Sequence, residues 1–132
     1  MIQTQTVLIL GAGASGPYGF PSGYELLIRV LDLGIANQLI RAGFEAGEVK
    51  QFQYSLGHSG TLSVDAFLEH RPEFLRIGKF AIALLLIPFE DEARLFTKYS
   101  SPGWYDYLFG QLSTDFDSFG ANRLSIITFN YD

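Results

Sequence analysis

The fold is decided near the start of the chain, where Val7-Leu8-Ile9-Leu10 runs directly into Gly11-Ala12-Gly13-Ala14-Ser15-Gly16. A short, continuously apolar run closed by a glycine is typical of a strand buried on both faces of a parallel sheet. The six residues after it have the pattern G-x-G-x-x-G, in which glycines let the backbone approach a pyrophosphate while amide N–H groups point toward it. We therefore predict a nucleotide-phosphate loop here. The alternative is a tight turn from a strand to a helix with no ligand.

A second apolar run, Leu124–Phe129, predicts a second buried strand far along the sequence. It leads into Asn130-Tyr131-Asp132. Ligands bind outside the carboxyl ends of strands in open α/β sheets. Asn130 and Asp132, two residues apart, are therefore expected on one side of the strand end, facing the same crevice as the glycine loop. The alternative is an ordinary Asn/Asp turn after a strand.

The residues between the two strands are expected to be mostly helical. Ser22 is expected to cap a helix, with Glu25 as its capping-box partner, and Ser63 to cap another. Further helices are expected over residues 35–52, 73–86 and 104–112, with a loop at residues 55–60. The aromatic side chains of residues 104–109 are expected to pack in a core or an interface. The predicted fold class is α/β, with a large helical insertion between two parallel strands.

The composition narrows the classes of function. Of 132 residues, 48% are hydrophobic and 17% are charged, against about 25% charged in average proteins, so a packed core is expected. The net charge of −5 argues against a broad electrostatic contact with nucleic acid. The chain has no cysteine, which excludes a disulfide scaffold and a Cys-ligated zinc site. Two histidines, His58 and His70, leave little material for a His-based metal site.

No stretch of the sequence indicates a membrane. The first residues carry no basic segment, and the longest apolar run, Phe80–Phe89, is far shorter than the roughly 20 residues that span a bilayer. We expect that run to be a buried helix segment, and the protein to be cytoplasmic.

Three related hypotheses are disfavoured by specific residues. A Walker A loop needs Lys and then Ser or Thr after its last glycine, where Pro17 and Tyr18 stand. A serine-hydrolase elbow needs G-x-S-x-G, which the stretch Gly57–Thr61 misses by one position. An ordinary dehydrogenase needs a helix directly after the glycines, but Pro21 would lie inside that helix at a cost of about 3 kcal/mol.

Taken together, the two motifs resemble the sirtuin-like NAD-binding family. Sirtuins carry a Gly-Ala-Gly-x-Ser loop, a Gly-Ile-Pro segment and a Thr-Gln-Asn-Ile-Asp strand end, and Gly11–Ser15, Gly19-Phe20-Pro21 and Thr128–Asp132 follow this order. The chain is more similar still to divergent bacterial sirtuin-like domains associated with defence against phage. These share a Tyr-Gly-Phe-Pro-Ser-Gly stretch, here residues 18–23, and a segment like residues 63–69. The resemblance spans most of the chain.

The resemblance implies a Rossmann-like, three-layer fold of sirtuin type and gives roles to individual residues. Asn130 corresponds to the family's catalytic asparagine, and Asp132 to the aspartate that contacts the nicotinamide amide. The expected cofactor-binding residues besides Asp132 are Gly11, Ala12, Gly13, Ser15 and Pro21. Phe129 replaces the sirtuin glutamine, Ser22-Gly23 replaces Asp-Phe, and zinc-binding cysteines are missing. These departures favour plain NAD⁺ hydrolysis over protein deacetylation.

The function implied by the resemblance is that of an NAD⁺ glycohydrolase, acting as a bacterial anti-phage effector that depletes NAD⁺, with no metal. In NAD⁺ the leaving group is already a cationic pyridinium and needs no protonation. The protein must therefore mainly orient the ribose and place a water. The family's catalytic histidine follows the asparagine strand, and neither His58 nor His70 matches it. The alternatives are a non-catalytic module that senses NAD⁺ or ADP-ribose, and a structural interaction domain.

The resemblance also bears on domain organisation. We expect residues 1–132 to form the N-terminal part of a single sirtuin-like domain whose remaining strands follow Asp132, and to be inactive alone. Two buried-type strands by themselves would expose sheet edges and apolar faces. Self-association through the sheet edge or the helix at Trp104–Phe109 is therefore expected, giving a homo-oligomer.

Overall fold

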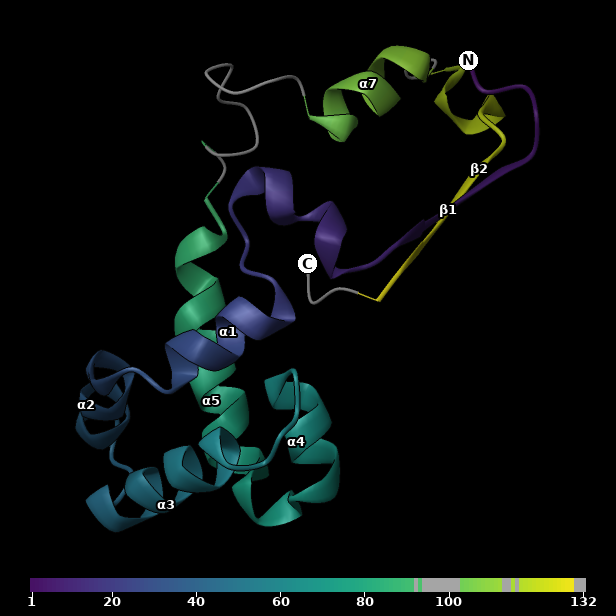
Figure 1. The fold of residues 1–132 in the computed structure, drawn as a ribbon. Helices are drawn as coiled ribbons and strands as arrows, with labels where there is room; N and C mark the ends of the chain where they lie inside the picture. The colour runs from purple at the N-terminus through teal and green to yellow at the C-terminus, as the bar shows by residue number, and fades with distance from the viewer. Residues whose placement is uncertain (92, 94–102, 113–114, 116, 130–132) are drawn as a thin grey trace. The chain divides into compact units, whose positions relative to one another are not determined.

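The computed structural model describes residues 1–91, 93, 103–112, 115 and 117–129 (Figure 1). They belong to two compact units. The sheet unit consists of Met1–Gly19 and the described part of Glu92–Asp132, and the helical unit of Phe20–Asp91. The protein is therefore mixed α/β and mostly helical, as the sequence predicts.

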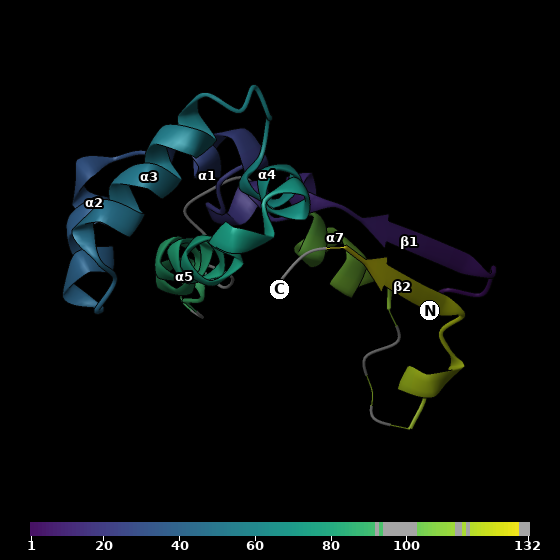
Figure 2. The ribbon, with the colours of Figure 1, turned by 90° about the horizontal axis from the view of Figure 1, so that it is seen from below.

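The sheet unit is built on two adjacent parallel strands. β1 (Thr6–Leu10) pairs with β2 (Leu124–Thr128), with Thr6 beside Leu124 and Leu10 beside Thr128. Figure 2 shows the two arrows side by side and pointing the same way. The ladder extends one residue past the end of β2, because Phe129 N–H donates to Leu10 O at 3.0 Å. The prediction of two neighbouring parallel strands is confirmed. The expectation that each strand is buried on both faces is wrong, because Ile9 of β1 and Ile127 of β2 are 70% and 47% exposed.

Short turns and an α-helix also belong to the described part of the sheet unit. They are two 3₁₀ turns after β1, η1 (Ala12–Ala14) and η2 (Gly16–Tyr18), then α7 (Trp104–Gln111), and η5 (Phe119–Ala121) before β2. Pro17 lies in the first turn of η2, and the first α-helix after the glycines begins only at Gly23. An ordinary dehydrogenase has an α-helix directly after its glycines, and this chain has two 3₁₀ turns there instead.

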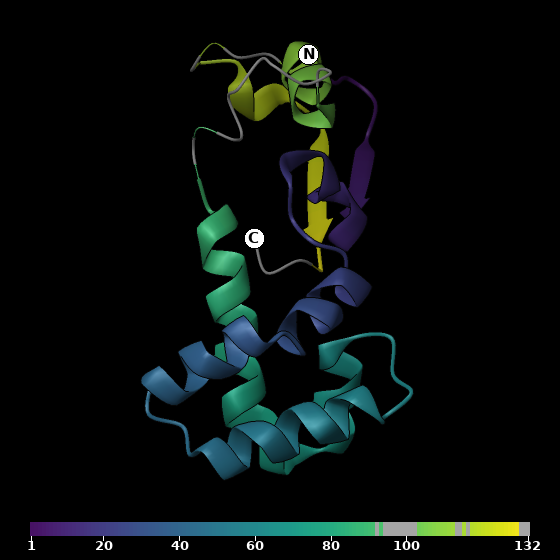
Figure 3. The ribbon, with the colours of Figure 1, turned by 60° about the vertical axis from the view of Figure 1, so that its left-hand side comes forward.

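The helical unit contains five α-helices among its residues 20–91. They are α1 (Gly23–Val30), α2 (Leu33–Arg41), α3 (Ala46–Gly57), α4 (Val64–His70) and α5 (Leu75–Leu86), with 3₁₀ turns η3 (Pro72–Phe74) and η4 (Ile87–Phe89). The other four α-helices each contact α5, the teal-to-green helix in Figure 3. The core of this unit is therefore arranged around α5.

The core of the helical unit is apolar and rich in phenylalanine. Phe52, Phe67 and Phe74 form a cluster with ring centroids 5.7 to 6.2 Å apart. Such tilted and offset ring pairs add about 0.5–1.5 kcal/mol each beyond the apolar area that they bury. Among the fully buried side chains are Val30, Leu39, Val49, Phe52, Leu56, Val64, Phe67 and Ile77.

Both predicted helix caps are confirmed. Ser22 Oγ accepts from Glu25 N–H at 3.3 Å, while Glu25 Oε2 accepts from Ser22 N–H at 2.7 Å, which is a complete capping box. Ser63 Oγ accepts from Ala66 N–H at 3.2 Å. Each cap satisfies backbone donors that the first turn of a helix leaves without an intrahelical acceptor.

The single helix predicted over residues 35–52 is wrong. Two helices occupy this range, because α2 ends at Arg41 in a Schellman motif. Gly43 has φ +99° and donates to Ile40 O, and Phe44 N–H donates to Leu39 O at 3.1 Å. A glycine in the left-handed region stops the helix, and the chain turns before α3 begins at Ala46.

Two smaller expectations are also corrected. The loop predicted at residues 55–60 is shorter, because α3 continues to Gly57. The apolar run at residues 80–89 is not a fully buried helix, since α5 ends at Leu86 and the side chains of Phe80 and Ile87 are 40% and 61% exposed. Among the helices that the structure describes, none combines the length and apolar character that a membrane crossing needs.

Candidate functional site

The glycine loop follows β1 at the carboxyl edge of the parallel pair. Because Leu10 lies beside Thr128, β2 ends at the same edge at which Gly11 begins. In the described part of the chain, the glycine loop therefore begins beside the end of β2, and the chain can be followed past β2 as far as Phe129. Asn130 and Asp132 lie outside the described residues, so their predicted roles stay predictions.

Two successive 3₁₀ turns give the loop its shape. In η1, Ala14 N–H donates to Gly11 O at 2.8 Å and Ser15 N–H to Ala12 O at 3.3 Å. The amides of Ala12 and Gly13 therefore donate no hydrogen bond inside this turn. In η2, N–H groups of the turn again donate three residues back, and Gly19, with φ +90°, ends it. The loop is a defined backbone structure rather than an open coil.

The three glycines of the motif have room around them. A Cβ built on Gly11, Gly13 or Gly16 meets no described atom within 4 Å. None of the three has a positive φ, unlike Gly19. Neither crowding nor backbone conformation in the described structure therefore requires glycine at these positions.

Ser15 differs from its neighbours in burial. It is 7% exposed, and among the residues that the structure describes it is the one polar residue that is buried. Its N–H donates to Ala12 O and its carbonyl accepts from Tyr18 N–H at 3.0 Å, so Ser15 joins the two turns.

The first turn of α7 contacts the loop from the opposite end of the sequence. Trp104 Nε1 donates to Ala14 O at 2.7 Å, and Tyr105 N–H donates to Tyr18 Oη at 3.1 Å. The Tyr18 and Tyr105 rings lie 5.0 Å apart. The sequence predicted packing for these aromatic residues but no partner. The one available signal was that a partly buried indole N–H requires an acceptor.

The loop carries no acidic or basic side chain. Residues 11–19 contain no Asp, Glu, His, Lys or Arg. Two lowered pKa values lie in the helical unit, where the Ser22 backbone N–H lowers the pKa of Glu25 and the Arg71 side chain lowers the pKa of Glu73. Anion binding at the loop would therefore rely on backbone N–H groups.

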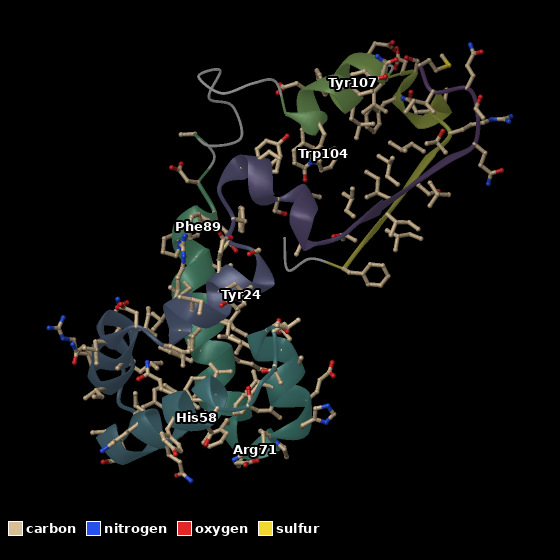
Figure 4. All side chains as sticks on the ribbon, in the orientation of Figure 1. Tyr24, His58, Arg71, Phe89, Trp104 and Tyr107 are labelled. Carbon is tan, nitrogen blue, oxygen red and sulfur yellow. The ribbon has the colours of Figure 1, made fainter. Side chains whose placement is uncertain are left out.

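The remaining predicted residues lie in the helical unit. Pro21 is buried there. His58 is exposed at the end of α3, where its ring stacks on Tyr54 and its Nδ1 lies 2.8 Å from Tyr54 O. Figure 4 labels His58 among the helices of this unit. His70 is the last residue of α4. Within the described residues, no three His, Asp or Glu side chains gather in a way that could hold a metal ion.

Comparison of the chain with protein-family models, curated proteins and solved structures found no match. The resemblance to the sirtuin-like family therefore rests on the sequence motifs, and the site is interpreted from its own geometry.

Proposed function

We propose that the intact protein binds NAD⁺ at the loop of residues 11–16 and hydrolyses its nicotinamide–ribose bond, in a Rossmann-like fold of sirtuin type. The observation that carries the proposal is the open space beside Gly11, Gly13 and Gly16. A glycine costs roughly 0.5–1 kcal/mol relative to alanine in regular structure, and three that the protein itself does not need suggest the close approach of a ligand. A pyrophosphate approaching backbone amides is such a ligand.

The position of the loop supports a ligand that reaches across the sheet edge. β1 and β2 end side by side, so a dinucleotide held at the loop would extend toward the residues that follow Phe129. Asn130 would then orient a water or a ribose hydroxyl, and Asp132 the nicotinamide amide. The role proposed for the whole protein is depletion of NAD⁺ in the bacterial cytoplasm during phage attack, which the sequence resemblance suggests.

The lack of charge in the loop gives the proposal a specific signature. Phosphate binding by Lys or Arg weakens as salt screens the charges, whereas binding by backbone amides depends less on ionic strength. We expect NAD⁺ affinity to change little with salt. A steep loss of affinity with salt would instead indicate a cationic site elsewhere on the chain.

The deciding experiment measures NAD⁺ binding by calorimetry and free nicotinamide by chromatography, for the wild type and two matched variants. Gly13 and Gly120 are each the central residue of a three-residue 3₁₀ turn in the sheet unit, and both have open space at Cβ. Gly13→Val should abolish binding, and Gly120→Val should preserve it. Equal binding by both variants would show that the glycine loop is not the site.

A non-catalytic NAD⁺ or ADP-ribose sensor is the second candidate. The observation in its favour is that both histidines belong to the helical unit, so the unit with the loop has no histidine among residues 1–19 or 92–132 to act as a base. Saturable binding without nicotinamide release, unchanged by Asn130→Ala, would support the sensor. Nicotinamide release that disappears in Asn130→Ala would support the hydrolase.

A further inference from the structure

Two hydrogen bonds connect the glycine loop to a helix about ninety positions away in the sequence. The indole N–H of Trp104 reaches Ala14 O at 2.7 Å, and the backbone N–H of Tyr105 reaches Tyr18 Oη at 3.1 Å. All four residues belong to the sheet unit. Figure 4 shows Trp104 at the end of α7 nearest the loop.

The carbonyl of Ala14 occupies a special place in the loop. It lies at the junction of η1 and η2, where the hydrogen bonds of one turn stop and those of the next begin. Backbone N–H groups of the two turns donate to the neighbouring carbonyls, those of Gly11, Ala12, Ser15 and Gly16. The indole N–H supplies a donor for Ala14 O, as a partly buried carbonyl requires.

We propose that Trp104 is a positioning residue for nucleotide binding. By holding Ala14 O, its rigid indole keeps η1 and η2 in the arrangement that leaves the glycine side of the loop open to a phosphate. The inference rests on the proposed function, and it assigns Trp104 a contact with the loop rather than with the ligand. A defined loop lowers the conformational entropy lost on binding, so this contact raises affinity.

The start of α7 is fixed to the loop at a second point. A Cβ on Gly103 would overlap the Tyr18 hydroxyl, so glycine is required for this close approach. Tyr18 Oη accepts one of the N–H groups that the first turn of α7 leaves without an intrahelical partner. Two contacts, one on each side of the Ala14–Ser15 junction, prevent a rotation of the loop that a single contact would permit.

The test replaces the indole N–H and nothing else. Trp104 is the single tryptophan of the 132 residues, so incorporation of benzothienylalanine, which has sulfur in place of N–H, changes one site. Loss of one hydrogen bond should weaken NAD⁺ binding by about 5- to 10-fold. Tyr107→Phe serves as the control, because Tyr107 lies on the same helix and is 73% exposed. It should bind like the wild type.

Amide hydrogen exchange in the absence of nucleotide provides the readout that distinguishes positioning from general stability. The analogue should speed exchange at Ala14 and Ser15, whose N–H groups form η1, and leave exchange at Phe129 in the strand ladder unchanged. Faster exchange at Phe129 as well would show a merely structural role. In the wild type, the emission of Trp104 should shift on addition of NAD⁺.

The two proposals fail in different ways. Wild-type protein that binds neither NAD⁺ nor ADP-ribose would overturn the proposed function and the positioning role together. Wild-type binding that the benzothienylalanine analogue retains in full, with unchanged exchange at Ala14, would overturn the positioning role alone.

Discussion

Gly78 of α5 lies directly against the side chain of Leu68 in α4, so that a Cβ at residue 78 would come within 2.6 Å of Leu68 Cδ2. Leu68 is 5% exposed and packs in the core of the helical unit, so it has little room to move away. The absence of a side chain at Gly78 therefore sets how closely α4 and α5 approach.

Gly78→Ala should destabilise the helical unit despite the higher helix propensity of alanine. Overpacking of a core costs roughly 1–3 kcal/mol, which exceeds the gain of about 1 kcal/mol from replacing a helical glycine. The control is Gly47→Ala in α3, where a Cβ meets nothing within 4 Å. Gly47→Ala should be neutral or stabilising in urea unfolding. A Gly78→Ala variant as stable as Gly47→Ala would contradict this packing.

Gln53 joins three helices through its side-chain amide. Its Nε2 donates to Val30 O at 2.7 Å and to Asp32 O at 3.3 Å, where α1 ends and α2 begins. Gln53→Ala leaves both carbonyls without this donor, and we expect a loss of about 1–2 kcal/mol in the free energy of unfolding. Gln51→Ala, an exposed position on the same helix, should change it by less than about 0.5 kcal/mol. Equal effects of the two variants would show that the hydrogen bonds of Gln53 are unimportant.

The capping box of α1 should make stability depend on pH. The pKa of Glu25 is lowered, first by the hydrogen bond from the Ser22 backbone N–H and then by the Ser22 side chain, with Arg29 adding to it. Because the pKa of Glu25 is lower in the folded state, its ionised carboxylate stabilises the fold at pH values above the ordinary pKa of Glu, which is about 4.3. This contribution is lost as the pH falls through the lower folded-state pKa.

Glu25→Gln should therefore be less stable than the wild type at neutral pH and approach it in strong acid. Glu45→Gln is the matched control, because Glu45 stands at the N-cap of α3 without making a side-chain capping hydrogen bond. Urea unfolding at neutral and acid pH measures both. A Glu25→Gln difference that persists unchanged in acid would assign the effect to lost packing rather than to charge.

Local signals explain which parts of the fold could be predicted. The caps at Ser22 and Ser63 act on N–H groups three residues away, so the sequence alone identifies them. The continuous apolar runs likewise predicted the two parallel strands. The break at Gly43 was missed because a glycine also occurs inside helices, and what stops α2 there is the left-handed φ together with the bond from Phe44 N–H to Leu39 O.

The candidate site depends on contacts that no local pattern contains. The glycine loop was predicted from its spacing after a strand, whereas the bond from Trp104 to Ala14 joins residues 90 positions apart. Only the folded chain brings them together. The open space beside Gly13 is likewise a property of the three-dimensional structure, and our proposal of a binding loop depends on it.

One face of the two-stranded sheet is apolar and exposed. Strand alternation places Val7, Ile9 and Ile127 on the same face, with Ile9 beside Ile127 in the register. Ile9 is 70% exposed, Ile127 47%, and Phe129, which continues the face, 78%. Contiguous apolar patches of this kind in contact with water promote association.

We expect residues 1–132 to self-associate through this face, so that the sedimentation coefficient rises with protein concentration. Ile9→Lys should reduce the association strongly, because a charge in an apolar contact costs several kcal/mol unless it is paired. Tyr107→Lys tests the aromatic helix α7, which the sequence predicted as a route of association besides the sheet edge, and it should have little effect if the sheet face dominates. Reversal of these two results would assign association to α7. A wild-type protein that stays monomeric at all concentrations would show that other residues cover the sheet face.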